Sequence, residues 1–586
     1  MSKEFSLIST KLELEVCKNK KKVLAGNWCY QDNDKKKFHS NLVTNNPWSS
    51  PRDFNNDYKY IKNLLNRCII SIVEYLNKIH NKKFSKKFWK ILILPWLTIY
   101  LPAYYFRWRL IKQILKIQKD INFYNLENLK NEFVPTDSYD FHKNIRNSQE
   151  FNYLIFRKII FFLNTKEKVK VKKKLYKNKL FNNNKTKNNQ FMFQFKLILN
   201  NFFFRLFSIN DIFLEKSVFR KIDNFKISII LRQIPTFFYD TFNGAFGFKN
   251  FYENEIIDYK KRNSVKLYLN CKTDFEKFLK SSITGDIPLC FVEGFERLYS
   301  FSKKIKMRPK KIISSYFHYF NELFKFWVAF LKENKLTKFY SVTHGGGGFM
   351  KYPSCLNFEK EIADKQIVWY RSNFLNEIQL PSSKFITKSK DMSTKQFISF
   401  VEGPTNLFPS RLGFATIGNE NTNPFDIFLK FYKNINLLNK QDIIYLPKKE
   451  HNINASKNLV NFLQKNKIKK PNSFNIYNRK SKLNIISYPQ TTFCESIQTT
   501  PTILIYEKNK WEFNSKFKHI YKKLIKNKIL FHNPIKAAQH VNKVSKNIDA
   551  WWMQKKVQST INQFLNDVSL ISENSIKIWV NKLKTL

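Results

Sequence analysis

Glycine is scarce in this chain, with 12 residues among 586. Acidic residues are also few: 45 Asp and Glu stand against 103 Lys and Arg, which gives a formal net charge of +58. Such an excess is typical of proteins that bind nucleic acid or an anionic membrane surface. Here the lysines are spread along the whole chain, alongside the abundant Asn, Ile and Phe that AT-rich codons produce. We therefore expect no specific nucleic-acid partner, because dedicated binders gather their basic residues on one face or motif.

Paired cysteines and long apolar runs are missing as well. The seven cysteines form no Cys-x-x-Cys pair and no disulfide framework, so we expect a cytoplasmic protein. The N-terminal residues contain no apolar core of the signal-peptide type. The uncharged segment 91–106 is shorter than the roughly 20 residues of a spanning helix, and it contains Pro95 and Pro102. We expect a buried helix-and-turn segment there; the alternative is peripheral contact with an anionic inner membrane through its basic flanks.

Several motifs of well-known enzyme classes are absent. The sequence has no Walker loop, no complete Gly-x-Gly-x-x-Gly fingerprint, no His-Glu-x-x-His zinc motif and no Gly-x-Ser-x-Gly nucleophile elbow. Its remaining histidines and cysteines lack the spacing of metal ligands, and no acidic pair stands at the end of an expected strand. The sequence therefore predicts neither a metal site nor a bound cofactor.

What the sequence does contain is a pattern of alternating strands and helices. Apolar residues recur at helical spacing over residues 57–118, and residues 165–190 are a Lys- and Asn-rich stretch that we expect to be an exposed insertion. Further along, short apolar runs predict strands at 287–294, 339–344, 397–403, 442–447, 483–488 and 501–506. Between them the pattern predicts helices at 315–333, 426–438, 455–465 and from 492 onward, with a link over 362–395.

This alternation is typical of parallel, doubly wound sheets. We expect an α/β protein with two Rossmann-like halves that face a cleft, and an added N-terminal helical region. The first domain should span residues 1–395, with the helical segment and the basic insertion inside it. The second should span residues 396–586 and end in closing helices.

The most informative motif is THGGGGF, Thr343 to Phe349. Four of the 12 glycines are consecutive here, directly after an expected strand. Glycines at such a place let backbone N–H groups approach an anion closely, so Gly345, Gly346, Gly347 and Gly348 are candidate phosphate-binding residues. His344 stands at the strand end and is our candidate general base. A flexible surface loop with an incidental histidine is the alternative.

A second motif is SYPQTTFCES, Ser487 to Ser496, where a strand ends and a helix begins. Helix N-termini bind phosphate through free N–H groups and the helix dipole, so Thr491 and Thr492 are candidate donor-binding residues. Glu495 can accept hydrogen bonds from ribose hydroxyls. Alternatively, Thr492 and Glu495 have the spacing of a capping box, which would explain both residues structurally.

Three further residues are weaker candidates for binding an anionic donor. Lys448 and His451 follow the strand at 442–447, at the carboxyl end of the expected sheet. Arg411 lies in the segment PSRLGF, residues 409–414. In so basic a chain, each is also compatible with an ordinary solvated loop.

Taken in order, these motifs resemble the transferases encoded among O-antigen and other surface-polysaccharide genes. The resemblance rests on LAGNWC (24–29), NDYKYI (56–61), FWKILILPWL (88–97), FKFWVAFLKENKLTKFYSVTHGGGGF (324–349), LPSSKF (380–385), ISYPQTTFCES (486–496), PTILIYEKNKWEF (501–513) and AAQHVNKVSKNIDAWW (537–552). It implies a two-domain, GT-B-like glycosyltransferase architecture in which the N-terminal domain holds the acceptor and the C-terminal domain binds a nucleotide-activated sugar.

The resemblance also bears on single residues. His344 is similar to the histidine of the His-Gly motif in polymer glycerol-phosphate transferases, and His451 to their second histidine. The chain departs from the pattern in two places: the strand at 442–447 lacks an arginine, and Met350 stands where a glycine is usual.

The function expected from the resemblance is transfer of a sugar or related group to a hydroxyl acceptor, a glycan or a lipid-linked glycan, during bacterial surface-polysaccharide synthesis. The donor diphosphate would lie at Thr491 and Thr492, and His344 would deprotonate the acceptor. Two alternatives remain: a sugar-nucleotide epimerase of the same architecture, and a non-catalytic basic scaffold that binds membrane or polyanion.

Overall fold

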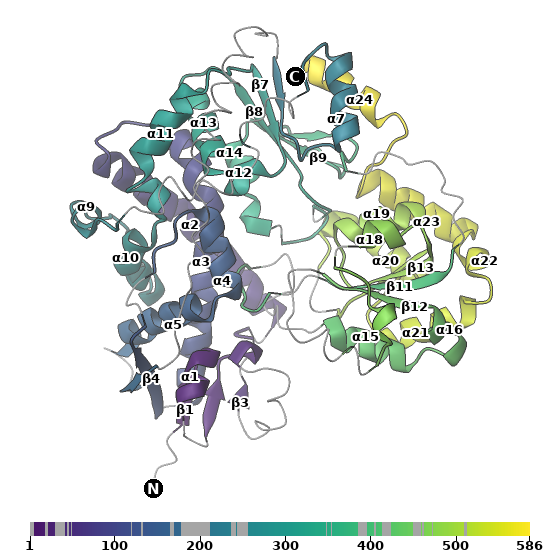
Figure 1. Ribbon diagram of the computed structural model, residues 1–586, viewed down its shortest axis with the longest axis horizontal. Coiled ribbons are helices and arrows are strands. Elements are labelled where there is room, and N and C mark those ends of the chain that lie inside the picture. Colours follow the sequence, from purple (N-terminus) through teal and green to yellow (C-terminus); the bar gives the residue numbers. More distant parts are fainter. Residues whose placement is uncertain are drawn as a thin grey trace. The chain divides into compact units, whose positions relative to one another are not determined.

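Figure 1 shows the computed structural model of the chain. The structure describes residues 5–17, 21–29, 42–43, 46–48, 50–118, 120–129, 133–164, 169–176, 211–235, 242, 256–346, 348–352, 354–384, 395–403, 406–412, 424–448, 459, 462–471, 473–508 and 512–586. The chain forms two compact units. The first comprises residues 1–341, 355–364 and 408–412, and the second comprises residues 342–354, 365–407 and 413–586.

The first unit begins with a five-stranded parallel sheet in the order β3-β2-β1-β4-β5. Its strands are β1 (Phe5–Ile8), β2 (Lys22–Leu24), β3 (Leu42–Val43), β4 (Ile121–Glu127) and β5 (Val169–Leu175). Residues 165–190 were expected to be an exposed insertion; in the described part, residues 170–175 are indeed exposed, but they form a strand that pairs with β4 along its whole length. The rest of that stretch lies outside the described residues, apart from Tyr176.

Two long helices, α2 (Pro51–Ile79) and α3 (Lys86–Ile117), confirm the helical region predicted over residues 57–118. The expected turn in segment 91–106 is wrong, because α3 runs unbroken through Pro95 and Pro102. A proline inside a helix costs about 3 kcal/mol, whereas each large apolar side chain buried contributes about 1.5–3 kcal/mol. Every residue from Ile91 to Phe106 is buried, so burial outweighs the two prolines.

The apolar side chains of this segment are therefore packed inside the protein, and the peripheral contact expected through its basic flanks stays a prediction. Among the described residues, no helix is both long enough and apolar enough to span a bilayer.

A second group of parallel strands in the first unit is formed by β6 (Ile212–Leu214), β7 (Lys311–Ser314) and β8 (Lys338–Val342). The strand predicted at 287–294 is wrong: a 3₁₀ turn, η4 (Leu289–Phe291), stands there, and its N–H groups bond to carbonyls of Pro135 and Thr136. The helix predicted at 315–333 is two helices, α12 (Phe317–Phe320) and α13 (Glu322–Glu333), separated where Asn321 caps α13.

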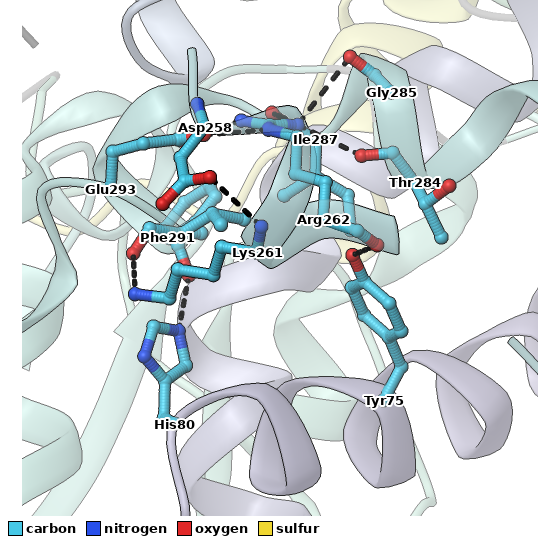
Figure 2. A network of polar contacts seen from close by, with 11 residues as sticks. Tyr75, His80, Asp258, Lys261, Arg262, Thr284, Gly285, Ile287, Phe291 and Glu293 are labelled. Atoms are coloured by element: carbon cyan, nitrogen blue, oxygen red, sulfur yellow. Dashed lines mark hydrogen bonds and ion pairs between the residues drawn. The ribbon is translucent and has the colours of Figure 1, made fainter. Parts of the chain in front are cut away.

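The turn at η4 is held by a buried ion pair, shown in Figure 2. Arg262, on the short helix α9 (Tyr259–Asn263), donates from Nε and Nη2 to both carboxylate oxygens of Glu293 at 2.7 Å. Its Nη1 donates to the carbonyls of Thr284, Gly285 and Ile287, at the end of α10 (Asp274–Asp286). All three guanidinium nitrogens thus have partners, so we interpret the arrangement as a structural clamp.

The second unit contains the five-stranded parallel sheet that carries the candidate site. Its strand order is β12-β11-β13-β14-β15, made by β11 (Phe397–Val401), β12 (Ile443–Leu446), β13 (Ser481–Ile486), β14 (Thr502–Ile505) and β15 (Leu530–Phe531). These strands confirm the runs predicted from residue 397 onward and add β15. Two more strands, β9 (Lys365–Val368) and β10 (Glu377–Gln379), pair in parallel within the stretch expected to be a link.

Helices cover both faces of this sheet (Figure 1). On one face lie α19 (Thr491–Thr499) and α23 (Lys555–Asp567), and on the other α15 (Pro424–Lys433) and α21 (Pro534–Val544). The α/β class with parallel, Rossmann-like sheets is thus confirmed. The helix predicted at 455–465 lies largely outside the described residues.

Candidate functional site

The strand order of the second unit marks one point at the sheet edge. The chain runs from β11 outward to β12, and then returns to place β13 on the other side of β11. In doubly wound sheets, ligands bind outside the carboxyl ends of the strands at such a reversal. We therefore expect a ligand-binding site at the residues that follow β11 and β13.

The two strand ends are packed closely together. The Ser487 hydroxyl, just after β13, donates to the Val401 carbonyl of β11 at 2.9 Å. A Cβ on Gly403 would lie 3.2 Å from Ser487 Oγ and equally close to the Tyr488 ring, so a side chain there would crowd both residues. The chain after β13 then turns directly into α19.

The start of α19 has no side-chain cap. Its N-cap is Gln490, whose side chain makes no capping hydrogen bond. The first N–H groups of a helix lack partners within it and form the positive end of its dipole. The capping-box interpretation is wrong, because α19 begins at Thr491, which places Thr492 inside the helix instead of at the N-cap.

The glycine loop lies directly on this helix start. The Gly346 N–H donates to the Thr491 hydroxyl at 2.9 Å. A Cβ on Gly345 would lie 2.6 Å from Thr491 Oγ1, and one on Gly346 would lie 2.7 Å from Cys494 Sγ. Both separations are too short for real atoms, so glycine is what permits the contact. The alternative of a free surface loop is therefore wrong for these two residues, while Gly347 lies outside the described residues.

His344 precedes this contact by two residues. Its side chain keeps exposed surface, although protein surrounds it closely on other sides. Burial, with a smaller contribution from the charge of Lys384, lowers the pKa of His344 to about 4. The imidazole is neutral at physiological pH as a result, which is the form that can accept a proton.

Glu402 was missed by the sequence reasoning. It follows β11 directly, is almost fully buried, and accepts a hydrogen bond from the Lys448 N–H at 2.9 Å. Burial raises the pKa of Glu402 to about 7. The sequence FISFVEG contained a pointer to this residue, because an acidic residue and a glycine directly follow an apolar strand there.

Thr492 and Glu495 lie near a tyrosine that borders the site. The Tyr488 and Thr492 hydroxyls share a short hydrogen bond. Burial raises the pKa of Tyr488 to about 12, and the charge of Glu495 adds to this rise. Tyr488 is thus a neutral hydroxyl beside the helix start, and Glu495 is a nearby acceptor.

The remaining candidates fall in different places. The Lys448 backbone is anchored by Glu402 at the end of β12. Arg411 belongs to the first unit. There, burial of His142 lowers the pKa of that histidine, and the charge of Arg411 lowers it further. His451 lies outside the described residues. In the described part of the chain, no three His, Cys, Asp or Glu side chains gather as metal ligands would.

A protein-family model described as the LIC12162 family transferase matches residues 5–583. The chain belongs to this family. No curated protein matches the chain. Because the match spans nearly the whole sequence, this LIC12162 family member is a transferase, and an enzyme of that class must bind a group donor and an acceptor.

Proposed function

We propose that this LIC12162 family transferase moves a sugar or a related group from a nucleotide-activated donor to a hydroxyl acceptor, a glycan or lipid-linked glycan, in bacterial surface-polysaccharide synthesis. One observation carries the proposal: the loop that bears His344 is packed onto the start of α19, which has no side-chain cap, through the Gly346–Thr491 hydrogen bond. This contact supports a site in which His344 is the proton acceptor and the start of α19 binds the anion.

In this scheme the donor diphosphate lies at the N-terminus of α19. The free N–H groups and the Thr492 hydroxyl would bind its oxygens, and Glu495 would accept hydrogen bonds from the ribose. The Gly346 N–H is already used by Thr491, so any loop amide that meets the phosphate belongs to a neighbouring glycine such as Gly345.

The transfer itself needs one base and one leaving group. Neutral His344 takes the proton of the acceptor hydroxyl, and the oxygen forms a bond to the donor's reacting carbon. The bond from that carbon to the diphosphate breaks, and the electron pair leaves on the nucleoside diphosphate. The positive end of α19 stabilises the charge that develops there.

A GT-B-like division of labour would complete this scheme, with the acceptor held by the N-terminal domain, residues 1–395, and the donor by residues 396–586. Arg411 and His451 would then be further anion ligands. We place this chemistry in the cytoplasm, at the inner face of the membrane.

The test is a thermal-shift series with UDP-, GDP-, CDP- and dTDP-activated sugars. A ligand present at 100 times its Kd stabilises the folded state by about 2.7 kcal/mol, so one nucleotide class should raise the melting temperature clearly. His344→Asn should keep this shift and lose transfer. If no nucleotide stabilises the protein at millimolar concentration, the proposal fails.

A further inference from the structure

Helix α7 (Lys221–Ile230), in the first unit, turns its apolar side chains outward. The exposed fractions are 60% for Ile222, 41% for Phe225 and 55% for Ile229. These positions are three and four residues apart, so they form one stripe along the helix. Ile230 widens the same exposed face.

The opposite face of α7 is polar and buried. Asp223, Asn224 and Ser228 are each no more than 2% exposed, and only Ile227 among the buried residues is apolar. Asp223 accepts a hydrogen bond from Arg220 Nε at 2.6 Å, and Ser228 bonds to Asn224. A surface helix ordinarily shows the reverse arrangement, with its apolar stripe inward. Both bonds lie within α7 and its N-cap residue, so the buried polar side chains are paired locally while the apolar stripe faces out.

The charge of the exposed face has one sign. At 100° per residue, Phe225, Ile229 and Ile222 lie at the centre of the face, with the exposed Lys221 and Lys226 at its two borders. The single acid of the helix, Asp223, is buried and paired with Arg220. The outward face thus combines an apolar centre with a cationic rim.

We infer that α7 docks on the surface of an anionic lipid bilayer. The apolar centre would enter the boundary between headgroups and acyl chains, while the lysines meet lipid phosphates. A second copy of this chain is a poor occupant, because pairing two such faces would bring lysine rims together in a protein of net charge +58.

This surface is separate from the segment that the sequence suggested for membrane contact. Residues 91–106 belong to α3 and are buried, whereas α7 has an exposed face that carries two lysines. The inference is independent of the donor chemistry proposed above, since it needs only the exposed face of α7.

The experiment measures binding of the full chain to vesicles by co-sedimentation. One set contains phosphatidylcholine with about one third phosphatidylglycerol, and the other contains phosphatidylcholine alone. We expect binding to the anionic set only. The triple variant Ile222→Ser, Phe225→Ser, Ile229→Ser should bind at least roughly tenfold more weakly, and Lys221→Gln with Lys226→Gln roughly 30-fold more weakly.

The triple serine variant distinguishes docking of α7 from non-specific electrostatic attraction between the basic protein and the anionic vesicles, because it keeps every charge of the protein. Its control is Leu437→Ser with Leu438→Ser on α16 (Leu437–Asp442), where the two side chains are 79% and 76% exposed. That control should bind like the unchanged protein, and both variants should keep their melting temperatures. Equal vesicle binding by the triple variant would overturn the inference. So would light scattering that shows a dimer which the triple variant breaks.

Discussion

His344 combines an exposed side chain with a pKa lowered to about 4 by its surroundings. An ordinary surface histidine would be partly protonated near pH 6.5 and would lose its capacity to accept a proton there. Here the neutral form persists down to about pH 4, so the ring can accept a proton throughout the physiological range, with a lower proton affinity than an ordinary histidine.

We predict that His344→Asn lowers kcat by roughly 10²- to 10⁴-fold, the usual contribution of a general base. In the unchanged enzyme, kcat should fall only on approach to pH 4 and should show no inflection between pH 6 and 8 from this group. The measurement is a pH–rate profile with the donor that the thermal-shift series identifies. Full turnover by the asparagine variant would remove His344 from the mechanism.

Glu402 gives a prediction about stability. Its pKa is about 7 in the folded protein, against 4.5 for an unperturbed carboxyl, so its contribution is fully present below pH 4.5 and is lost as pH rises through 7. The shift corresponds to about 3 kcal/mol. Glu402→Gln stays uncharged and can still accept the Lys448 N–H.

The glutamine variant should therefore gain stability relative to the unchanged protein between pH 5.5 and pH 8.5. Denaturant unfolding at both pH values measures the change, and the difference between the two proteins cancels other titrating groups. A difference that stays constant with pH would show that Glu402 is already ionised.

The glycine loop can be tested by adding a single methyl group. Gly346→Ala would place a Cβ 2.7 Å from Cys494 Sγ and 3.0 Å from the Thr491 nitrogen. Such crowding typically costs 1–3 kcal/mol and would displace His344. We expect a lower melting temperature and a strong loss of transfer.

A matched control is Gly285→Ala near the end of α10, where a Cβ meets nothing within 4 Å. Alanine is favoured over glycine in helices by roughly 1 kcal/mol, so this variant should be as stable as the parent or more so. Similar behaviour of the two variants would mean that the loop tolerates side chains.

At the scale of elements, a substitution at the start of α19 can distinguish an effect on nucleotide binding from an effect on protein stability. Thr492→Asp adds a negative charge in the first turn, which favours the helix dipole by roughly 0.3–1 kcal/mol but repels a phosphate. We predict an unchanged or higher melting temperature without ligand, and loss of the shift with nucleotide.

Thr492→Asn serves as the neutral comparison and should retain part of the nucleotide response. Calorimetric titration of both variants gives the affinities directly. If the aspartate variant binds nucleotide normally, the phosphate lies elsewhere.

The elements that the sequence predicted well are those with strong local signals. Residues 57–118 and the strands from 397 onward have clear apolar periods, and they appear as helices and strands. The run at 287–294 has a strand-like composition, yet Arg262 and the carbonyls of Pro135 and Thr136 hold it as a turn. Contacts from distant parts of the chain decided that case.

In the candidate site, too, local motifs could be predicted from the sequence, whereas contacts between distant residues could not. THGGGGF and the threonine pair stood out because glycine is rare and a strand precedes each motif. The sequence could not show that Gly346 bonds to Thr491, which lies 145 residues away. Glu402 and α7 were missed for a related reason: the first depends on burial, and the second reverses the usual rule about which face is apolar.

For the whole molecule, the dominant quantity is the net charge of +58. Like charges repel one another in the compact state, and salt screens them over about 8–10 Å near physiological ionic strength. We predict that raising NaCl from about 0.05 M to about 0.5 M increases the melting temperature.

Each kcal/mol of added folding stability should raise the melting temperature by roughly 2–4 °C for a unit of about 150–250 residues. Scanning fluorimetry measures the shift, and KCl should act like NaCl if screening is the cause. A decrease with salt would mean that the surface ion pairs outweigh the repulsion.

The hydrogen bond from Gly346 to Thr491 has one more consequence. A phosphate that settles at the start of α19 will meet the same threonine hydroxyl, so the arriving nucleotide acts on the peptide unit that carries the histidine. We expect the imidazole to take its working direction only while a donor is seated. Such coupling would keep the base out of its working position whenever the donor site is empty.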